Sequence, residues 1–145
     1  MNAVEAFLTP EEEQEIIEAI RQAELHTSGE IRVHLEGHSE REPMQRAREV
    51  FHALKMDNTK EENGVLIYVA VHDHRFAIWG DRGINAVVPA NFWEGTRDIM
   101  RSHFQSKNFK QGLIAGIQSA GQQLSTFFPW SHDDENELPD TLSKS

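Results

Sequence analysis

The sequence contains no cysteine and no long uninterrupted hydrophobic segment. Without cysteine, disulfide bonds, thiolate zinc sites and a cysteine nucleophile are excluded. A membrane-spanning helix needs ~20 predominantly apolar residues. The nearest stretch, residues 112–128, is interrupted by glutamine and serine. The sequence therefore predicts no membrane span.

Positive charge is also scarce. The chain has 14 Lys and Arg residues against 24 Asp and Glu residues, which gives a formal net charge of −10. This balance argues against a nucleic acid or an anionic membrane surface as the main partner. It favours a divalent cation, a basic protein partner or simple solubility.

The length and the start of the chain indicate one soluble domain. The first residues, MNAVEAFLTPEEE, lack the basic start and the apolar core of a secretory signal. With no cysteine either, we expect a cytoplasmic protein. A chain of 145 residues with eight Phe and three Trp is long and apolar enough to bury one core. We place the domain at residues 1–130 and expect an acidic, flexible tail at residues 131–145.

Four segments have apolar residues at helical spacing. The first begins at Thr9, because Thr9, Pro10 and Glu12 match a capping box with proline at the first helical position. Pro43 opens the second helix. The predicted helices cover residues 10–26, 43–54, 92–104 and 110–127.

Residues 65–71 form an unbroken apolar run, which is typical of a strand covered on both faces. A polar turn at residues 72–74 returns the chain as an antiparallel strand over residues 75–80. The alternating segment 31–35 forms a further strand, which a βαβ crossover should place parallel to the central one. Residues 84–88 are predicted as a brief fourth strand at an edge. The fold class is therefore α/β, a three-layer α/β/α sandwich with a central mixed sheet of three to four strands.

Four polar residues are predicted to gather at one end of this sheet. Glu30 begins the first strand, Asn63 precedes the central strand, Asp81 ends the antiparallel strand between two glycines, and Asp57 follows the second helix near the same rim. Carboxylate, amide and backbone oxygens are the ligands that Ca²⁺ and Mg²⁺ favour. The sequence predicts a divalent-cation site at Glu30, Asn63, Asp81 and Asp57. The plainer alternative is that each carboxylate caps a helix, ends a strand or pairs with a nearby arginine.

Histidines form a second candidate group. His38 and His72 follow the carboxyl ends of the two parallel strands, where open α/β sheets bind ligands, and His34 and His74 lie close by in the sequence. A transition metal or acid–base role is conceivable there. However, residues 72–74 span a tight turn, where polar residues are expected. The zinc-protease pattern H-E-x-x-H is also absent, so we favour the turn interpretation.

Phosphate-binding motifs are absent. The sequence has no G-x-x-x-x-G-K-[ST] loop and no G-x-G-x-x-G after a strand. If the protein cleaves a phosphate ester, the remaining mechanism is attack by a water molecule. A metal ion bound by carboxylates would activate that water.

Several ordered motifs together resemble the TPM domain family, also called the TPM phosphatase family, which is known from thylakoid lumen and bacterial proteins. They extend over nearly the whole chain up to about residue 129. The motifs are the segments 7–9 (FLT), 28–33 (SGEIRV), 63–67 (NGVLI), 80–85 (GDRGIN), 92–93 (FW), and 109 with 112–113 (F, GL).

The resemblance implies an α/β/α sandwich, divalent-cation binding with calcium reported among members, and a weak acid phosphatase activity. Some relatives help in photosystem repair or associate with membrane proteins. Many carry a signal peptide and a carboxy-terminal membrane helix. Neither is found here, which points to a short cytosolic branch. By motif position, the acidic rim of the family falls on Glu30, Asn63 and Asp81.

Three functions stay open at this point. The first is a binding or regulatory module that holds Ca²⁺ or Mg²⁺. The second is a metal-dependent phosphomonoesterase in which Asp81 and Glu30 are ligands of the metal. The third is a protein-interaction domain without a metal.

Overall fold

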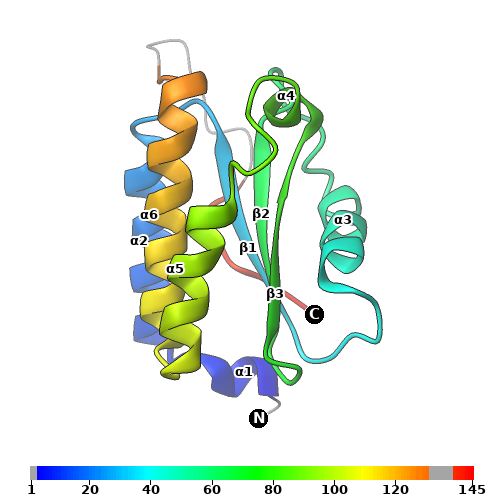
Figure 1. The fold of residues 1–145 in the computed structure, drawn as a ribbon. Coiled ribbons are helices and arrows are strands. Elements are labelled where there is room, and N and C mark those ends of the chain that lie inside the picture. Colours follow the sequence, from blue (N-terminus) through cyan, green and yellow to red (C-terminus); the bar gives the residue numbers. More distant parts are fainter. Residues whose placement is uncertain (1–2, 131–138) are drawn as a thin grey trace.

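The computed structural model describes residues 3–130 and 139–145. The described residues form a three-layer sandwich, which confirms the predicted α/β/α fold class (Figure 1). A central mixed sheet has the strand order β3-β2-β1-β4. Helices α2, α5 and α6 lie on one side of this sheet, and α3 lies on the other side.

The four predicted helices begin and end close to the predicted residues, and two short helices, α1 and α4, were not predicted. Their bounds are α1 Ala3–Phe7, α2 Pro10–Glu24, α3 Pro43–Ala53, α4 Arg82–Asn85, α5 Glu94–Gln105 and α6 Phe109–Phe127. The capping box at the start of α2 is present: Thr9 Oγ1 accepts from the Glu12 backbone N–H, and the Glu12 carboxylate accepts from the Thr9 N–H. These bonds satisfy amide donors that have no partner within the helix.

The strands are β1 Glu30–Glu36, β2 Gly64–Ala70, β3 Arg75–Gly80 and β4 Ser143–Lys144. Strands β1 and β2 are parallel, with Glu30 opposite Gly64, and β2 and β3 are antiparallel, with Val65 opposite Gly80. All seven residues of β2 are buried, as expected for a strand with helices over both faces.

Two separate cores follow from the alternation of side chains along the strands. On the side of α2, α5 and α6, residues such as Val33, Ile67 and Ile78 pack against the helices. On the other side, a smaller core joins Phe51 of α3 to Leu66 of β2. Polar side chains lie at the margins of this second core and form a cluster that is described below.

The predicted fourth strand at residues 84–88 is wrong. Asp81 is the N-cap of the single helical turn α4, and Ile84 points into the main core. A local hydrogen-bonded turn therefore replaces the extended edge strand that the apolar residues suggested. The fourth strand is instead β4, which lies parallel to β1 with Ser143 opposite His34.

Strand β4 belongs to the segment that was predicted to be a tail. Residues 131–138, which include the acidic run Asp133–Glu137, lie outside the described residues. Of the described part, Leu142 packs against the main core and Lys144 pairs with Glu13 of α2. Residues 139–145 thus complete the edge of the sheet.

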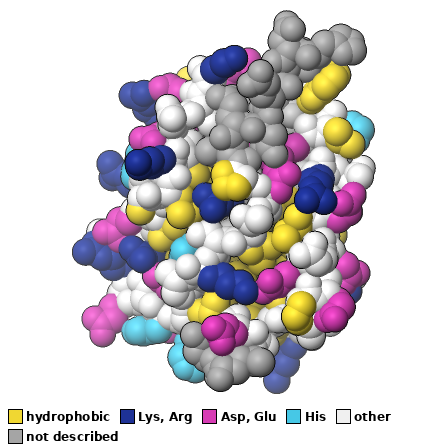
Figure 2. Space-filling model, turned by 180° about the vertical axis from the view of Figure 1, so that it is seen from behind, with side chains coloured by type: hydrophobic (Ala, Val, Ile, Leu, Met, Phe, Trp, Pro, Cys, Tyr) yellow, Lys and Arg dark blue, Asp and Glu magenta, His cyan; other side chains and the backbone are white. Residues whose placement is uncertain are grey.

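Charged side chains of both signs lie around the rim of the face opposite to the view of Figure 1, and hydrophobic side chains reach the surface along its middle (Figure 2). None of the described helices has both the length and the apolar character that crossing a membrane requires.

Candidate metal site

Two loops meet at the amino end of β2: residues 54–63, which follow α3, and residues 80–85, which follow β3. The Gly83 backbone N–H donates to the Glu62 carbonyl at 2.8 Å, and the Asp81 N–H donates to the Gly64 carbonyl at 3.0 Å. A Cβ atom on Gly83 would lie only 2.1 Å from the Glu61 carbonyl oxygen. Glycine is required at position 83 because the two backbones approach so closely.

Asp81 is the best-buried carboxylate of these loops, with 5% of its surface exposed. Its Oδ1 accepts from the Arg82 backbone N–H at 2.7 Å. Its Oδ2 is buried and has no hydrogen-bond partner among the described residues. A buried carboxylate oxygen without a partner is costly, and structures retain one chiefly where it has a role.

The electrostatic surroundings of Asp81 are acidic. Burial raises the pKa of its carboxyl group above the usual range, and the negative charges of Glu62 and Asp57 raise it further. The hydrogen bond from the Arg82 N–H opposes this shift without cancelling it. The carboxylate of Asp81 would therefore be stabilised by any cation placed beside it.

Glu62 and Asp57 are more exposed than Asp81. The side chain of Asp57 is 50% exposed, and one of its oxygens lies 3.2 Å from His52 Nδ1. Glu62 pairs with Arg82, whose side chain is 82% exposed. The backbone of Glu62 has a φ of 51°, in the left-handed region that residues other than glycine rarely adopt. Such strained positions are found preferentially at functional sites.

Asn63 is the last residue of the loop 54–63, and Glu30 lies beside it at the start of β1. Glu30 is paired with Gly64 across the sheet, and its N–H donates to the Asn63 carbonyl at 3.3 Å. Both residues are buried, with 3% and 1% of their surfaces exposed. The Asn63 side-chain amide donates to Ser28 Oγ and to the Glu61 carboxylate. Asn63 thus ties the start of β1 to the loop before β2.

The structure thus brings all four predicted residues to one end of the sheet. The charge of Asp57 acts on Asp81. Glu30 at the start of β1 and Asn63 just before β2 lie on either side of the pairing between these two strands. Within residues 3–130 and 139–145, no three acidic, histidine or cysteine side chains already stand close enough together to hold a metal ion. Binding of one ion by the predicted set stays a prediction.

Comparison with known proteins places the chain in a family. The model of the TPM domain matches residues 1–123. The chain belongs to the TPM domain family.

Solved structures agree with this assignment. The BA42 protein from the psychrophilic bacterium Bizionia argentinensis, known from an NMR structure, is 58% identical; the match covers 98% of each chain with a TM-score of 0.92. The N-terminal domain of a P. gingivalis protein is 20% identical, with a TM-score of 0.69 over 85% of this chain and 80% of that one. The N-terminal domain of the cg2496 protein from Corynebacterium glutamicum is 11% identical, with a TM-score of 0.65 over 95% and 80%. The last two show the fold alone. No curated protein matches the chain.

A second acidic group of this TPM domain lies beside the start of β1. The Glu24 carboxylate accepts from the Ile31 backbone N–H at 2.9 Å. Burial raises the pKa of Glu24 to about 10, and its hydrogen bond to Asp140 and the charge of Glu30 act in the same direction. The raised pKa favours the protonated form of Glu24, and its hydrogen bond with Asp140 joins α2 to the segment that leads to β4.

The His72 backbone N–H donates to the Gly37 carbonyl beside His38, but among the described residues these histidines are not part of any group of three side chains that could hold a metal ion. His38 Nδ1 lies 2.6 Å from Asp73 Oδ1, so the residue joins the loop after β1 to the β2–β3 turn. His34 is buried, and its two ring nitrogens lie 2.8 Å from Ser143 Oγ and Ser145 Oγ. Burial lowers the pKa of His34 to about 4, so the ring is neutral at pH 7. It holds β4 against β1.

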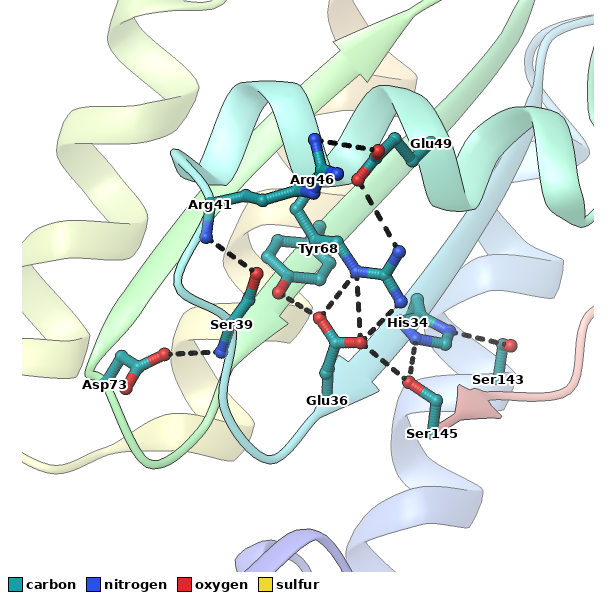
Figure 3. Close-up of polar contacts among 10 residues, drawn as sticks. All are labelled: His34, Glu36, Ser39, Arg41, Arg46, Glu49, Tyr68, Asp73, Ser143 and Ser145. Carbon is teal, nitrogen blue, oxygen red and sulfur yellow. Dashed lines mark hydrogen bonds and ion pairs between the residues drawn. The ribbon is translucent and has the colours of Figure 1, made fainter.

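A polar cluster on the α3 side of the sheet was not predicted (Figure 3). Arg46 of α3 and the Tyr68 hydroxyl both donate to the Glu36 carboxylate, and Ser145 Oγ donates to it at 3.2 Å. Burial alone would raise the pKa of Glu36, but the bonds from Arg46 and Tyr68 outweigh it and hold the pKa below the usual range. All acceptor atoms of Glu36 are occupied, so the cluster serves to join α3, β1, β2 and the last residues.

Sequence reasoning could have found part of what it missed. Glu62 directly precedes Asn63 and could have been included with it. Tyr68 is the one polar group in an otherwise apolar strand, and a buried tyrosine hydroxyl requires a partner. By contrast, the contacts of Glu24 with Asp140 and of His34 with Ser143 depend on where residues 139–145 dock, for which the sequence has no local signal.

Proposed function

We propose that this TPM domain binds a divalent cation, Ca²⁺ or Mg²⁺, where the loop 54–63 meets the loop 80–85, and that it acts as a binding or regulatory module. The observation that carries the proposal is the buried Oδ2 of Asp81, which has no hydrogen-bond partner among the described residues. A hard cation is the ligand that suits an oxygen of this kind, because it supplies the charge that a neutral donor cannot.

The acidic neighbours support the proposal. The charges of Glu62 and Asp57 raise the pKa of Asp81, so the three carboxylates repel one another in the absence of a cation. A bound ion relieves this repulsion. Asp57 and Glu62 are exposed enough to turn toward Asp81, and the carbonyl groups of the adjoining loop can complete an oxygen shell.

Glu30 and Asn63 have a different place in the proposal. Their buried side chains flank Gly64, between β1 and the loop. We assign them to the inner wall of the site, where they position the loop or bind the ion directly. The proposed regulatory role rests on stability, because a cation that bridges the two loops stabilises the folded domain.

Thermal denaturation of the purified chain with CaCl₂, with MgCl₂ and with chelator tests the proposal. A saturating ion should raise the midpoint of unfolding; at a concentration 100 times Kd the stabilisation is about 2.7 kcal/mol. Asp81→Asn should lose most of this effect. Asparagine also caps helices well, so α4 is retained in the variant. Asp98→Asn, which changes an exposed acid on α5, is the matched control.

Equal stabilisation of the unaltered chain and of Asp81→Asn would contradict the proposal. An aryl phosphate substrate added to the same samples separates the module from the phosphomonoesterase. Turnover that chelator and Asp81→Asn both abolish would favour the enzyme.

A cytoplasmic location is part of the proposal and is supported by the absence of cysteine.

A further inference from the structure

A cavity of about 610 Å³ lies at the opposite end of the sheet from Asp81. It is bounded by α1, the β2–β3 turn, the end of α5 and the start of α6, which meet at the bottom of Figure 1. This is the carboxyl end of β2, and open α/β sheets bind ligands beyond the carboxyl ends of their parallel strands. The volume is in the range of small-molecule sites.

The floor of the cavity is a row of four phenylalanines in contact with one another. Ring centroids are 5.3 Å apart for Phe76 and Phe104, 5.8 Å for Phe104 and Phe109, and 4.6 Å for Phe109 and Phe7. All four side chains are only half-buried. Each ring is held in place by the next and leaves part of its surface open, so the row offers a preformed platform for an apolar group.

The rim of the cavity is cationic, although the chain as a whole is strongly acidic. Arg75, Arg101 and Lys107 line it together with His74, and Glu42 is the one acidic residue among the described residues of the lining. The guanidinium of Arg101 lies 6.0 Å from the centre of the Phe76 ring, so charge and aromatic surface adjoin directly. Arg101 also pairs with Asp98, but both side chains are more than half exposed, and such a pair is weak.

The backbone supports the placement of two rim residues. His74 has a φ of 54° and Lys107 a φ of 62°, both in the left-handed region. Lys107 follows the end of α5, where its N–H donates to the Phe104 carbonyl and the Asn108 N–H donates to the His103 carbonyl. Glycine is the usual residue at this position. A lysine here costs some stability relative to glycine and places a cation at the cavity.

We propose that this cavity binds a small amphipathic carboxylate. Its aromatic or aliphatic body lies on the row Phe7, Phe109, Phe104 and Phe76, and its carboxylate is held by Arg101, Lys107 and Arg75. Arginine presents paired N–H donors that match a carboxylate. The site is independent of the proposed cation site, because the two lie at opposite ends of the sheet.

Amide NMR shifts of the full chain test the proposal with three probes. 1-Naphthoate has both rings and charge, 1-naphthamide has the rings without the charge, and acetate has the charge without the rings. We expect 1-naphthoate to shift the amides of residues 74–76 and 101–109 saturably. 1-Naphthamide should bind at least about tenfold more weakly, and acetate should cause no shift. Equal binding of the naphthoate and the naphthamide, or naphthoate shifts confined to other segments, would overturn the proposal.

Two variants identify the cations. Lys107→Gly removes the charge and supplies the residue that the left-handed position favours, so the fold is retained. Arg101→Gln removes the second charge. Each should weaken 1-naphthoate binding about three- to tenfold and leave 1-naphthamide unchanged. Arg97→Gln, on the same helix but outside the cavity lining, should bind like the unaltered chain. Undiminished naphthoate binding by both Lys107→Gly and Arg101→Gln would contradict the proposal.

Sedimentation with vesicles of phosphatidylglycerol separates a soluble ligand from a membrane surface. We expect the chain to stay in the supernatant, as its net charge of −10 predicts. Cosedimentation that Arg101→Gln abolishes would assign these cations to an anionic membrane and overturn the proposal.

Discussion

Arg46 binds Glu36 through two parallel contacts: Arg46 Nε lies 2.9 Å from Glu36 Oε2, and a terminal guanidinium nitrogen lies 2.6 Å from Oε1. The Glu36 side chain is 11% exposed and that of Arg46 is 31% exposed. Arg46 extends from α3 to Glu36, the last residue of β1 (Figure 3). The ion pair therefore holds α3 against the sheet.

Loss of the arginine should destabilise the fold strongly. Arg46→Ala leaves the Glu36 carboxylate buried with only hydroxyl donors. We expect the free energy of unfolding to fall by about 2–4 kcal/mol at neutral pH, as measured by urea denaturation. Arg48→Ala removes an exposed arginine two residues further along the same helix. It should cost less than about 0.5 kcal/mol.

The pH dependence of this variant distinguishes charge from packing. The pKa of Glu36 in the folded chain lies below its ordinary value of 4.5, so the pair stabilises the fold above that pH and loses its effect as the pH falls. The difference between Arg46→Ala and the unaltered chain should shrink in acid. A difference that is constant from neutral pH to below pH 4 would show that lost packing accounts for it.

Glu24→Gln should flatten the pH dependence of stability. The folded chain keeps a proton on Glu24 because burial raises its pKa to about 10, whereas the unfolded chain loses that proton near pH 4.5. Stability should therefore decline as the pH rises from about 5 toward 10, by at most about 1.4 kcal/mol per pH unit. A glutamine amide can accept from the Ile31 N–H and donate to Asp140 at any pH in this range, because it does not titrate.

Thermal denaturation between pH 6 and pH 9 measures this effect. The unaltered chain should lose stability across the range, and Glu24→Gln should lose much less. Glu18→Gln, at an exposed position of α2, should follow the unaltered chain. Parallel curves for all three proteins would refute the assignment of the proton to Glu24.

The positions that could be predicted from the sequence are those with a local cause. The capping box at Thr9 sets the start of α2, and the apolar run of β2 requires layers on both sides. The parallel pairing of β1 with β2 follows from the helix between them. Asp81 was also found this way, because its place follows from the antiparallel return of β3.

The elements that could not be predicted depend on contacts far apart in the sequence. Strand β4 consists of Ser143 and Lys144, which have no strand-like pattern. It forms by pairing with the edge of β1, a strand more than one hundred residues earlier in the sequence. The segment 84–88 has apolar residues, yet the side chain of Asp81 caps a helical turn there. The local capping interaction outweighed the weak preference of Val87 and Val88 for a strand.

Gly83→Ala should disrupt the meeting of the two loops. The added methyl group would lie 2.1 Å from the Glu61 carbonyl oxygen and 2.6 Å from that of Glu62, so the backbone has to move. We expect a loss of about 1–3 kcal/mol in the free energy of unfolding and a weaker response to calcium.

Gly95→Ala is the control for this substitution. A Cβ at position 95 meets no atom within 4 Å, and the residue lies in α5, where alanine is favoured. It should be neutral or stabilise the chain by up to about 1 kcal/mol. If Gly83→Ala behaves like Gly95→Ala, the close approach of the loops is not required for folding.

The most direct test of the proposed cation site is a calcium titration followed by backbone amide NMR, on the unaltered chain and on Asp81→Asn. The site predicts saturable shifts at residues 57–63 and 80–85 by millimolar calcium, with Glu30 affected next, and their loss in the variant. Amides that stay in place around Asp81, or that shift equally in both proteins, would contradict the cation site.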